Sequence, residues 1–193
     1  MIISQKNTIR LLCAKLHQFL TMKLIAIRSV YFSLFLLFAC GGKLQMHGEL
    51  FSQLMITEKG LFRGVQLGEA RSKILLAEQE APVEEDELFL KYSGNLGETG
   101  IWNIRYGFEE DQLYDILVDA EFADTSEGLQ LLRGFRSYFN DRYGLYIKEG
   151  GYLVWKGNPD DNADSVIEMI DESELVDFGQ FSLSFYPQQN KLP

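Results

Sequence analysis

The chain has 193 residues, 24% of them charged, and a formal net charge of −10. An acidic chain of this kind is poorly suited to nucleic acid, whose phosphates are neutralised by Lys and Arg. It holds only two Cys and two His, so thiolate chemistry, zinc sites and imidazole catalysis have few residues to draw on.

The first informative segment is Met22–Cys40, which is basic at its start and then apolar. Lys23 and Arg28 precede an apolar run of eleven residues, from 29 to 39. That length is typical of a secretory signal, because a helix needs about 20 apolar residues to span a bilayer. We therefore expect residues 1–39 to be a signal region in which either Met22 is the true start or residues 1–21 extend the basic segment and are removed with it. The alternatives are a signal that is cleaved without lipidation and an apolar helix of the core.

The apolar run ends in Leu37-Phe38-Ala39-Cys40, which resembles the lipobox of bacterial lipoproteins. In that family the cysteine is acylated and the chain is cut immediately before it. The resemblance implies that Cys40 becomes the first residue of the mature chain and anchors it in a membrane through acyl chains. Each buried methylene contributes about 0.8 kcal/mol, and more than one acyl chain is needed for stable anchoring.

Removal of residues 1–39 deepens the acidity of the chain. Those residues hold five of the 18 Lys and Arg and no Asp or Glu, so the remaining chain has 13 basic and 28 acidic residues and a net charge of −15. We expect residues 40–60 to be the lipid anchor and a flexible tether. With His47 on the tether, the domain would contain no His, which excludes a Ser-His-Asp arrangement. The alternative is one helical turn that docks on the domain through four apolar side chains. These are Leu50, Phe51, Leu54 and Met55.

Residues 61–193 are expected to form a single domain that begins with a helix and three strands. Ala70, Ile74 and Ala77 recur at helical spacing and predict a helix over 69–80. Alternation of apolar and polar residues then predicts three strands, over 88–93, 101–108 and 112–122. The predicted buried face of the third strand consists of Tyr114, Ile116, Val118, Ala120 and Phe122.

The second half of the domain repeats this order. Asp124 and Glu127 resemble a capping box before a helix over 126–143, and Gly144 is expected to end that helix. The predicted buried stripe of the helix consists of Leu129, Leu132, Phe135 or Arg136, Phe139 and Tyr143. Strands over 146–156, 165–170 and 180–186 follow. The first of these is either one strand or a hairpin that turns at Gly150-Gly151.

This order predicts an α+β fold in which two helices pack on an antiparallel β-meander, in one or more sheets. Duplication of an α-β-β-β unit would explain the order, because residues 88–94 and 152–157 both place an apolar strand after a helix and end in Gly. Chance alternation in two strands is the alternative.

One candidate metal site lies between the last strands. Asp160, Asn162 and Asp164 have the spacing of oxygen ligands in a calcium loop. Such a loop has Gly at its sixth position and Glu at its twelfth, where this chain has Ser165 and Asp171. A hairpin turn rich in Asp and Asn is the ordinary interpretation.

A candidate partner surface lies on the second helix and the strand that follows. Two arginines of this helix share a face, and Tyr and Trp are enriched at interface hot spots. The predicted contact residues are Arg133, Arg136, Tyr138, Tyr143 and Trp155. The alternative is that the arginines pair with local carboxylates and the aromatic rings lie in the core.

The acidic runs 84–87 and 109–111 are candidates for a carboxylate pair of the kind that hydrolyses glycosidic bonds. Charged runs in turns ordinarily face solvent, which is the alternative.

The eight residues before the first predicted helix read Phe62-Arg63-Gly64-Val65-Gln66-Leu67-Gly68-Glu69. This pattern, followed by an amphipathic helix and antiparallel strands, resembles small envelope lipoproteins of the BamE (SmpA/OmlA) type and the folds related to beta-lactamase inhibitor protein. The second group also repeats a helix-plus-sheet unit. The chain has one helix per unit and no Gly-x-Pro after the first helix, so the resemblance assigns no functional residues.

These observations predict a lipid-anchored protein of the bacterial cell envelope, on the inner or outer membrane, that faces the periplasm or the cell surface. We expect a non-enzymatic binding or assembly module with an envelope protein as its partner, without a cofactor and without nucleic acid. A carboxylate-based hydrolase of glycan or cell wall and a calcium-dependent binding module are the alternatives.

Overall fold

The structure is a computed structural model that describes residues 44–157, 165–171 and 179–188. These residues form a 3-10 helix, three α-helices and eight strands. In chain order they are η1 (Leu44–His47), α2 (Glu49–Met55), α3 (Arg71–Ala77), β1 (Glu84–Glu85), β2 (Phe89–Leu96), β3 (Gly100–Glu109), β4 (Gln112–Phe122), α4 (Thr125–Tyr143), β5 (Ile147–Glu149), β6 (Tyr152–Lys156), β7 (Ser165–Asp171) and β8 (Gly179–Pro187). The predicted α+β class is confirmed, but the described chain has three α-helices where two were expected.

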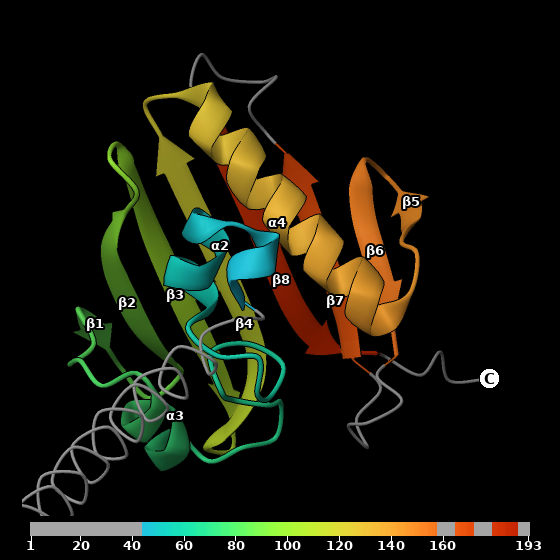
Figure 1. Ribbon diagram of the computed structural model, residues 1–193. Coiled ribbons are helices and arrows are strands. Elements are labelled where there is room, and N and C mark those ends of the chain that lie inside the picture. The colour runs from blue at the N-terminus through green and yellow to red at the C-terminus, as the bar shows by residue number, and fades with distance from the viewer. Residues whose placement is uncertain (1–43, 158–164, 172–178, 189–193) are drawn as a thin grey trace, which may run out of the picture. The chain divides into compact units, whose positions relative to one another are not determined.

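The eight strands form one antiparallel sheet in the order β1-β2-β3-β4-β8-β7-β6-β5 (Figure 1). Each half consists of strands that follow one another in the chain, and β4 joins β8 at the centre. The first half has four strands where three were expected, because β1 forms within the predicted acidic loop. In the second half the segment 146–156 folds as the hairpin β5–β6, one of the two structures predicted for it, so this half also has four strands.

The register of the sheet aligns the apolar residues of six strands into one buried row. Since side chains alternate between the two faces of a strand, residues that are paired across the sheet lie on the same face. One such row is completely buried and faces the helices. It consists of Leu90, Tyr106, Ile116, Phe185, Ile167 and Trp155.

A β-bulge corrects one sequence prediction in β4. Gly107 pairs with Asp115 and Phe108 pairs with Leu113, so Tyr114 is an extra residue on β4. The extra residue shifts the alternation, and as a result Leu113 is buried while Tyr114 is exposed. The prediction that Tyr114 lies on the buried face is therefore wrong, whereas the rest of that face is buried as predicted.

Helix α4 begins and ends as the sequence indicates, although its cap differs in detail. The Asp124 side chain accepts a hydrogen bond from the Ser126 N–H at 2.8 Å, and Gly144 follows the last turn with a positive φ of 86°. Glu127 does not close a capping box. Its carboxylate accepts from the Thr99 hydroxyl and from the Glu98 N–H, and the Thr99 bond is the main reason that its pKa lies below the ordinary value.

The buried stripe of α4 also differs from the prediction at its start. Leu129 is exposed, and Leu131 is buried in its place. The stripe therefore continues through Leu131, Leu132 and Phe135, and the prediction for Leu129 is wrong.

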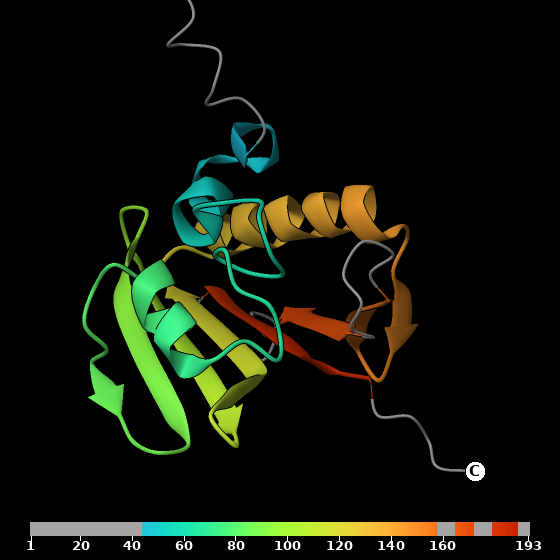
Figure 2. The ribbon, with the colours of Figure 1, turned by 90° about the horizontal axis from the view of Figure 1, so that it is seen from below.

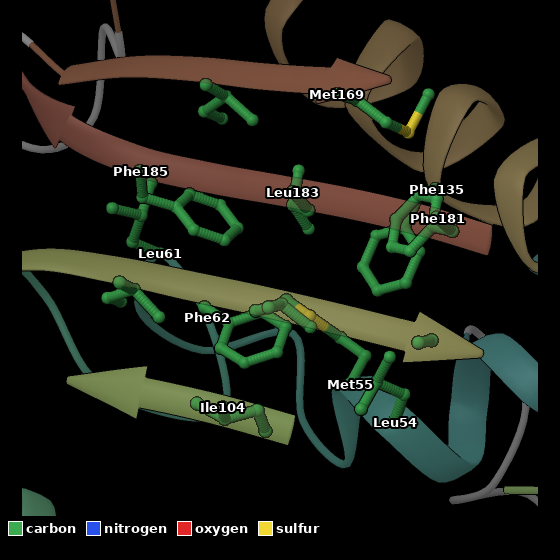
Figure 3. Close-up of a cluster of buried hydrophobic side chains, with 14 of the residues drawn as sticks. Leu54, Met55, Leu61, Phe62, Ile104, Phe135, Met169, Phe181, Leu183 and Phe185 are labelled. Carbon is green, nitrogen blue, oxygen red and sulfur yellow. The ribbon is translucent and has the colours of Figure 1, made fainter. Parts of the chain in front are cut away.

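The segment that we expected to be a flexible tether belongs to the packed unit from Leu44 onward. Leu50, Phe51, Leu54 and Met55 form the buried side of α2, as in the alternative prediction of a docked turn. Figure 3 shows Leu54 and Met55 in the same cluster as Phe62, Phe135 and Phe181. Four apolar side chains within seven residues stabilise the docked helix, because their burial compensates for the ordering of a short segment.

A glycine in α4 permits the close approach of this N-terminal segment. A Cβ atom on Gly134 would lie 2.5 Å from the His47 carbonyl oxygen and 2.9 Å from the Phe51 Cβ. The first contact is with backbone, so neither segment can relieve it by a rotamer change. Gly134 therefore marks the point where η1 and α2 cross α4.

Within the part of the chain that the structure describes, no helix has both the length and the apolar composition that crossing a membrane requires.

We expect Gly134→Ala to lower the free energy of unfolding by about 1–2 kcal/mol, measured by urea denaturation. The clash with the His47 carbonyl opposes and exceeds the roughly 1 kcal/mol that Ala contributes over Gly inside a helix. The control is Gln130→Ala, at an exposed position of the same helix, which should change stability by less than about 0.5 kcal/mol. A more stable Gly134→Ala variant would mean that α2 does not dock on α4.

Candidate functional site

The helices all lie on one side of the sheet (Figure 2). Both views place α2, α3 and α4 on the same face, and no described helix lies on the opposite one. We call this opposite face the open face. An antiparallel sheet can leave one face in water. The side chains on the open face therefore decide whether that face is only solvated or can bind another molecule.

The register places a chemically graded row of side chains across the open face. Lys91 and Arg105 stand at one end, Leu117 and Ser184 at the centre, and Glu168 follows on β7. Val154 and Ile147 continue the same row to the last strand. The row therefore passes from cationic groups on β2 and β3 to apolar ones on β5 and β6.

Carboxylates on β4 partly neutralise the cationic end. Arg105 Nη2 lies 3.3 Å from Asp115 Oδ2, and the Ser182 hydroxyl donates to Asp119 at 2.8 Å. Lys91 Nζ lies 3.9 Å from Glu84 at the edge of the sheet. These ion pairs are exposed and contribute little stability, so their residues can exchange partners at small cost.

A groove of about 570 Å³ crosses the open face between β2 and β8. Its walls combine charged groups such as Lys91 and Glu121, hydrogen-bonding groups such as Asn103 and Gln180, and the apolar Leu117. A surface with this mixture can bind another polypeptide through hydrogen bonds, ion pairs and a small apolar area.

The open face carries no Cys or His. The chain's Cys and His stand at positions 13, 17, 40 and 47, all before the sheet begins. Among the residues that the structure describes, no three of His, Cys, Asp or Glu are grouped so as to hold a metal ion.

On the helix side, a buried ion pair fixes the turn that carried the family resemblance. Arg63 donates to both carboxylate oxygens of Glu78, from Nε at 2.9 Å and from Nη2 at 2.7 Å, and the two side chains are only 9% and 2% exposed. Arg63 Nη1 also donates to the Leu54 carbonyl oxygen at 2.8 Å. The Tyr106 hydroxyl completes the cluster by donating to Glu78. This cluster therefore ties α2, α3 and β3 together.

The cluster stabilises the fold, since Arg63, Glu78 and Tyr106 are already hydrogen-bonded to one another. Burial, followed by the negative charge of Glu78, raises the pKa of the Tyr106 hydroxyl well above its ordinary value. Tyr106 consequently remains a donor at any physiological pH. The flanking Phe62 and Val65 are completely buried, so the Phe62-Arg63-Gly64-Val65 motif is a core turn.

The predicted partner residues on α4 and β6 do not form one surface. Arg133 is exposed and Arg136 is half-buried, but Tyr138 and Trp155 are only 5% and 2% exposed. Tyr143 is half-buried and packs against Phe139. Burial places the aromatic members in the core, as in the alternative prediction.

Both acidic runs are exposed, and Arg71 lies between them. Arg71 contacts Asp111 at 3.3 Å and Glu85 at 3.9 Å, and its guanidinium stacks on the Phe108 ring at 4.2 Å. The runs therefore serve to join β1, α3 and the β3–β4 hairpin. In that hairpin, Glu110 and Asp111 take the positive φ values that a two-residue turn requires.

One pair that the sequence analysis missed involves His47. Because His47 belongs to the folded unit, the prediction of a domain without His is wrong. His47 Nδ1 lies 3.2 Å from the Ser137 hydroxyl oxygen, and the imidazole packs edge-on against Phe51 and Tyr138. Ser137 lies in the middle of α4, where the backbone N–H groups are committed to helical bonds and cannot form an oxyanion hole. We interpret this pair as a docking contact of η1.

Four of the predicted site residues, Cys40, Asp160, Asn162 and Asp164, lie outside the described residues. Comparison of the chain with known proteins found no matching family model, no matching curated protein and no matching solved structure.

The Arg63–Glu78 pair generates a prediction about stability. Arg63→Met should lower the free energy of unfolding by about 3–5 kcal/mol, because it leaves the Glu78 carboxylate buried without its counter-ion. The measurement is urea denaturation of the full chain. The triple variant Arg63→Met, Glu78→Leu, Tyr106→Phe removes the whole cluster and should recover most of that loss. A triple variant less stable than Arg63→Met alone would show that the cluster is worth more than an apolar replacement.

Proposed function

We propose that this chain is a lipid-anchored protein of the bacterial cell envelope that acts as a non-enzymatic binding or assembly module. The proposed anchor is Cys40, acylated after removal of residues 1–39, with the folded unit exposed to the periplasm or the cell surface. The Leu-x-Ala-Cys sequence after a short apolar run supports the anchor.

The observation that carries the binding role is the open face. The described helices lie on one side of the eight-stranded sheet, which leaves the part of the other side over β2, β3 and β4 in water, whereas Val154 and Val166 farther along that side are buried. The groove of about 570 Å³ on that area has charged, amide and apolar side chains within one row of strands. Specific interfaces are only slightly more apolar than other protein surfaces, and this mixture agrees with that composition. We therefore place the partner on the open face and not on α4.

The hydrolase alternative requires two carboxylates that face each other across a cleft. The acidic runs lie instead on exposed turns, held by Arg71. The calcium alternative depends on residues outside the described part of the chain. The contacts of Arg71 with the acidic runs therefore favour the binding role over the hydrolase alternative.

We also infer that the domain arose by duplication of a helix-plus-strands unit. The two segments of similar sequence, 88–94 and 152–157, overlap β2 and β6. These strands occupy the same position in their halves of the sheet, one place from each outer edge. This correspondence supports a unit with four strands in place of the three first counted.

The anchor is tested by mass spectrometry of the mature chain isolated from bacterial membranes. We expect the chain to begin at Cys40 and to carry the mass of acyl groups on it. Cys40→Ala is the control and should abolish both processing and membrane retention. A mature chain that starts elsewhere and remains water-soluble would contradict the anchor.

The binding face is tested with a photo-crosslinking amino acid placed at Asn103 on the open face or at Gln130 on α4. Asn103 should yield one discrete protein adduct in intact cells, and Gln130 should yield none. The substitution Ile101→Arg, at an open-face residue that is 45% exposed, should reduce the adduct at least tenfold. Leu129→Arg is the matched control, because Leu129 is 37% exposed on α4 and should tolerate the change. Equal adducts from both positions, or no effect of Ile101→Arg, would contradict the proposed face.

A further inference from the structure

The outer edge of the sheet at β2 is mostly uncovered. β2 has eight residues, but β1 pairs only with Leu90 and Lys91. Figure 1 shows β1 beside one end of β2, with the remainder of that edge free of any described element. An uncovered edge exposes backbone donors and acceptors that can pair with another strand.

The hydrogen bonds already present show which residues face outward. Phe108 N–H donates to the Leu88 carbonyl, so the even-numbered residues of this strand bond to β3. On the other side, Val83 N–H donates to the Lys91 carbonyl at 2.8 Å, so the odd-numbered residues face the outer edge. Ser93 and Asn95 therefore point their N–H and C=O groups outward. Both are exposed, and neither group has a backbone partner within the described chain.

A side-chain pocket lies over β2, on the helix side of the sheet. It has a volume of about 400 Å³, and its walls come from the end of α2, the end of α3 and strands β2 and β3. The Trp102 indole crosses β2 directly above Gly94, since a Cβ there would lie 2.7 Å from the ring. Because Gly94 carries no side chain, the Trp102 indole can lie over β2, where it forms one wall of the pocket.

The charges at this pocket favour a cationic occupant. Arg63 is neutralised by Glu78, with which it forms the buried pair. Glu80 also lines the pocket, and it is exposed and forms no ion pair in the described part of the chain. The Trp102 ring already contacts the Arg63 guanidinium at 5.1 Å, so the group that attracts an added cation is the Glu80 carboxylate.

We propose that the edge of β2 at Ser93–Asn95 binds an extended peptide segment of a partner protein by strand addition. The backbone groups of Ser93 and Asn95 pair with the added strand, and a Lys or Arg on that strand places its side chain in the pocket. Main-chain pairing provides affinity in this mode of recognition, and the pocket that receives an alternate side chain provides specificity. This site is separate from the open face and does not depend on the proposed function.

The test uses the full chain and a fluorescein-labelled peptide, Thr-Val-Lys-Val-Thr, with binding followed by fluorescence anisotropy. The expected result is saturable binding, weakened at least fivefold when the central Lys is replaced by Glu. Ser93→Pro and Asn95→Pro should each weaken binding at least tenfold. Pro removes only an outward N–H at these positions, so the β2–β3 ladder remains intact.

Ser93→Ala is the control, because it changes the side chain and keeps the backbone N–H, and it should bind like the parent chain. Circular dichroism melting of both Pro variants within about 4 °C of the parent would show that the fold is retained. Unchanged binding in the Pro variants, equal loss in Ser93→Ala, or no binding of the Lys peptide would overturn the proposal. So would a concentration-dependent dimer that forms without peptide and is lost in Asn95→Pro, since the edge would then bind a second copy of this chain.

Discussion

The fold depends on the pairing of β4 with β8. Each half of the sheet is built from strands adjacent in the chain, but these two strands are separated by α4 and three other strands. Their pairing closes a loop on the order of 60 residues, an entropic cost that only burial on the helix face can offset. β8 begins in close contact with the segment before α4, because a Cβ on Gly179 would lie 3.2 Å from the Asp124 carbonyl oxygen. The buried row of side chains on the helix side and the row on the open face are continuous across the sheet only because the register between β4 and β8 is fixed.

The sequence was most informative where neighbouring residues determine the structure. The strands that became β3, β4, β7 and β8 were located by alternation, and α4 was located by its spacing and its terminal Asp and Gly. Alternation failed at Tyr114, since a bulge depends on how the partner strand is paired. For the segment 44–55 the sequence left two interpretations open, a flexible tether and a docked turn, because the docking of α2 depends on Gly134, far away in the chain.

The candidate site was less accessible to sequence reasoning. Tyr138 and Trp155 have the composition of interface residues, yet composition does not reveal which aromatic side chains a sheet will cover. The open face could not be located in advance, because it is defined by the side of the sheet on which the helices pack. The row from Lys91 to Ile147 is assembled from seven strands, and only the register brings its members together.

The docking of η1 and α2 has a mechanical consequence for a chain held by a lipid. Under the proposed anchoring, only three residues lie between Cys40 and the start of η1 at Leu44, and the four extended steps from one to the other reach at most about 14 Å. The folded unit would then be held close to the membrane, at the level of the lipid headgroups. Its strong negative charge would be repelled by anionic lipid at that distance and would restrict the orientations that it adopts. A partner would have to bind the folded unit within about that distance of the membrane surface.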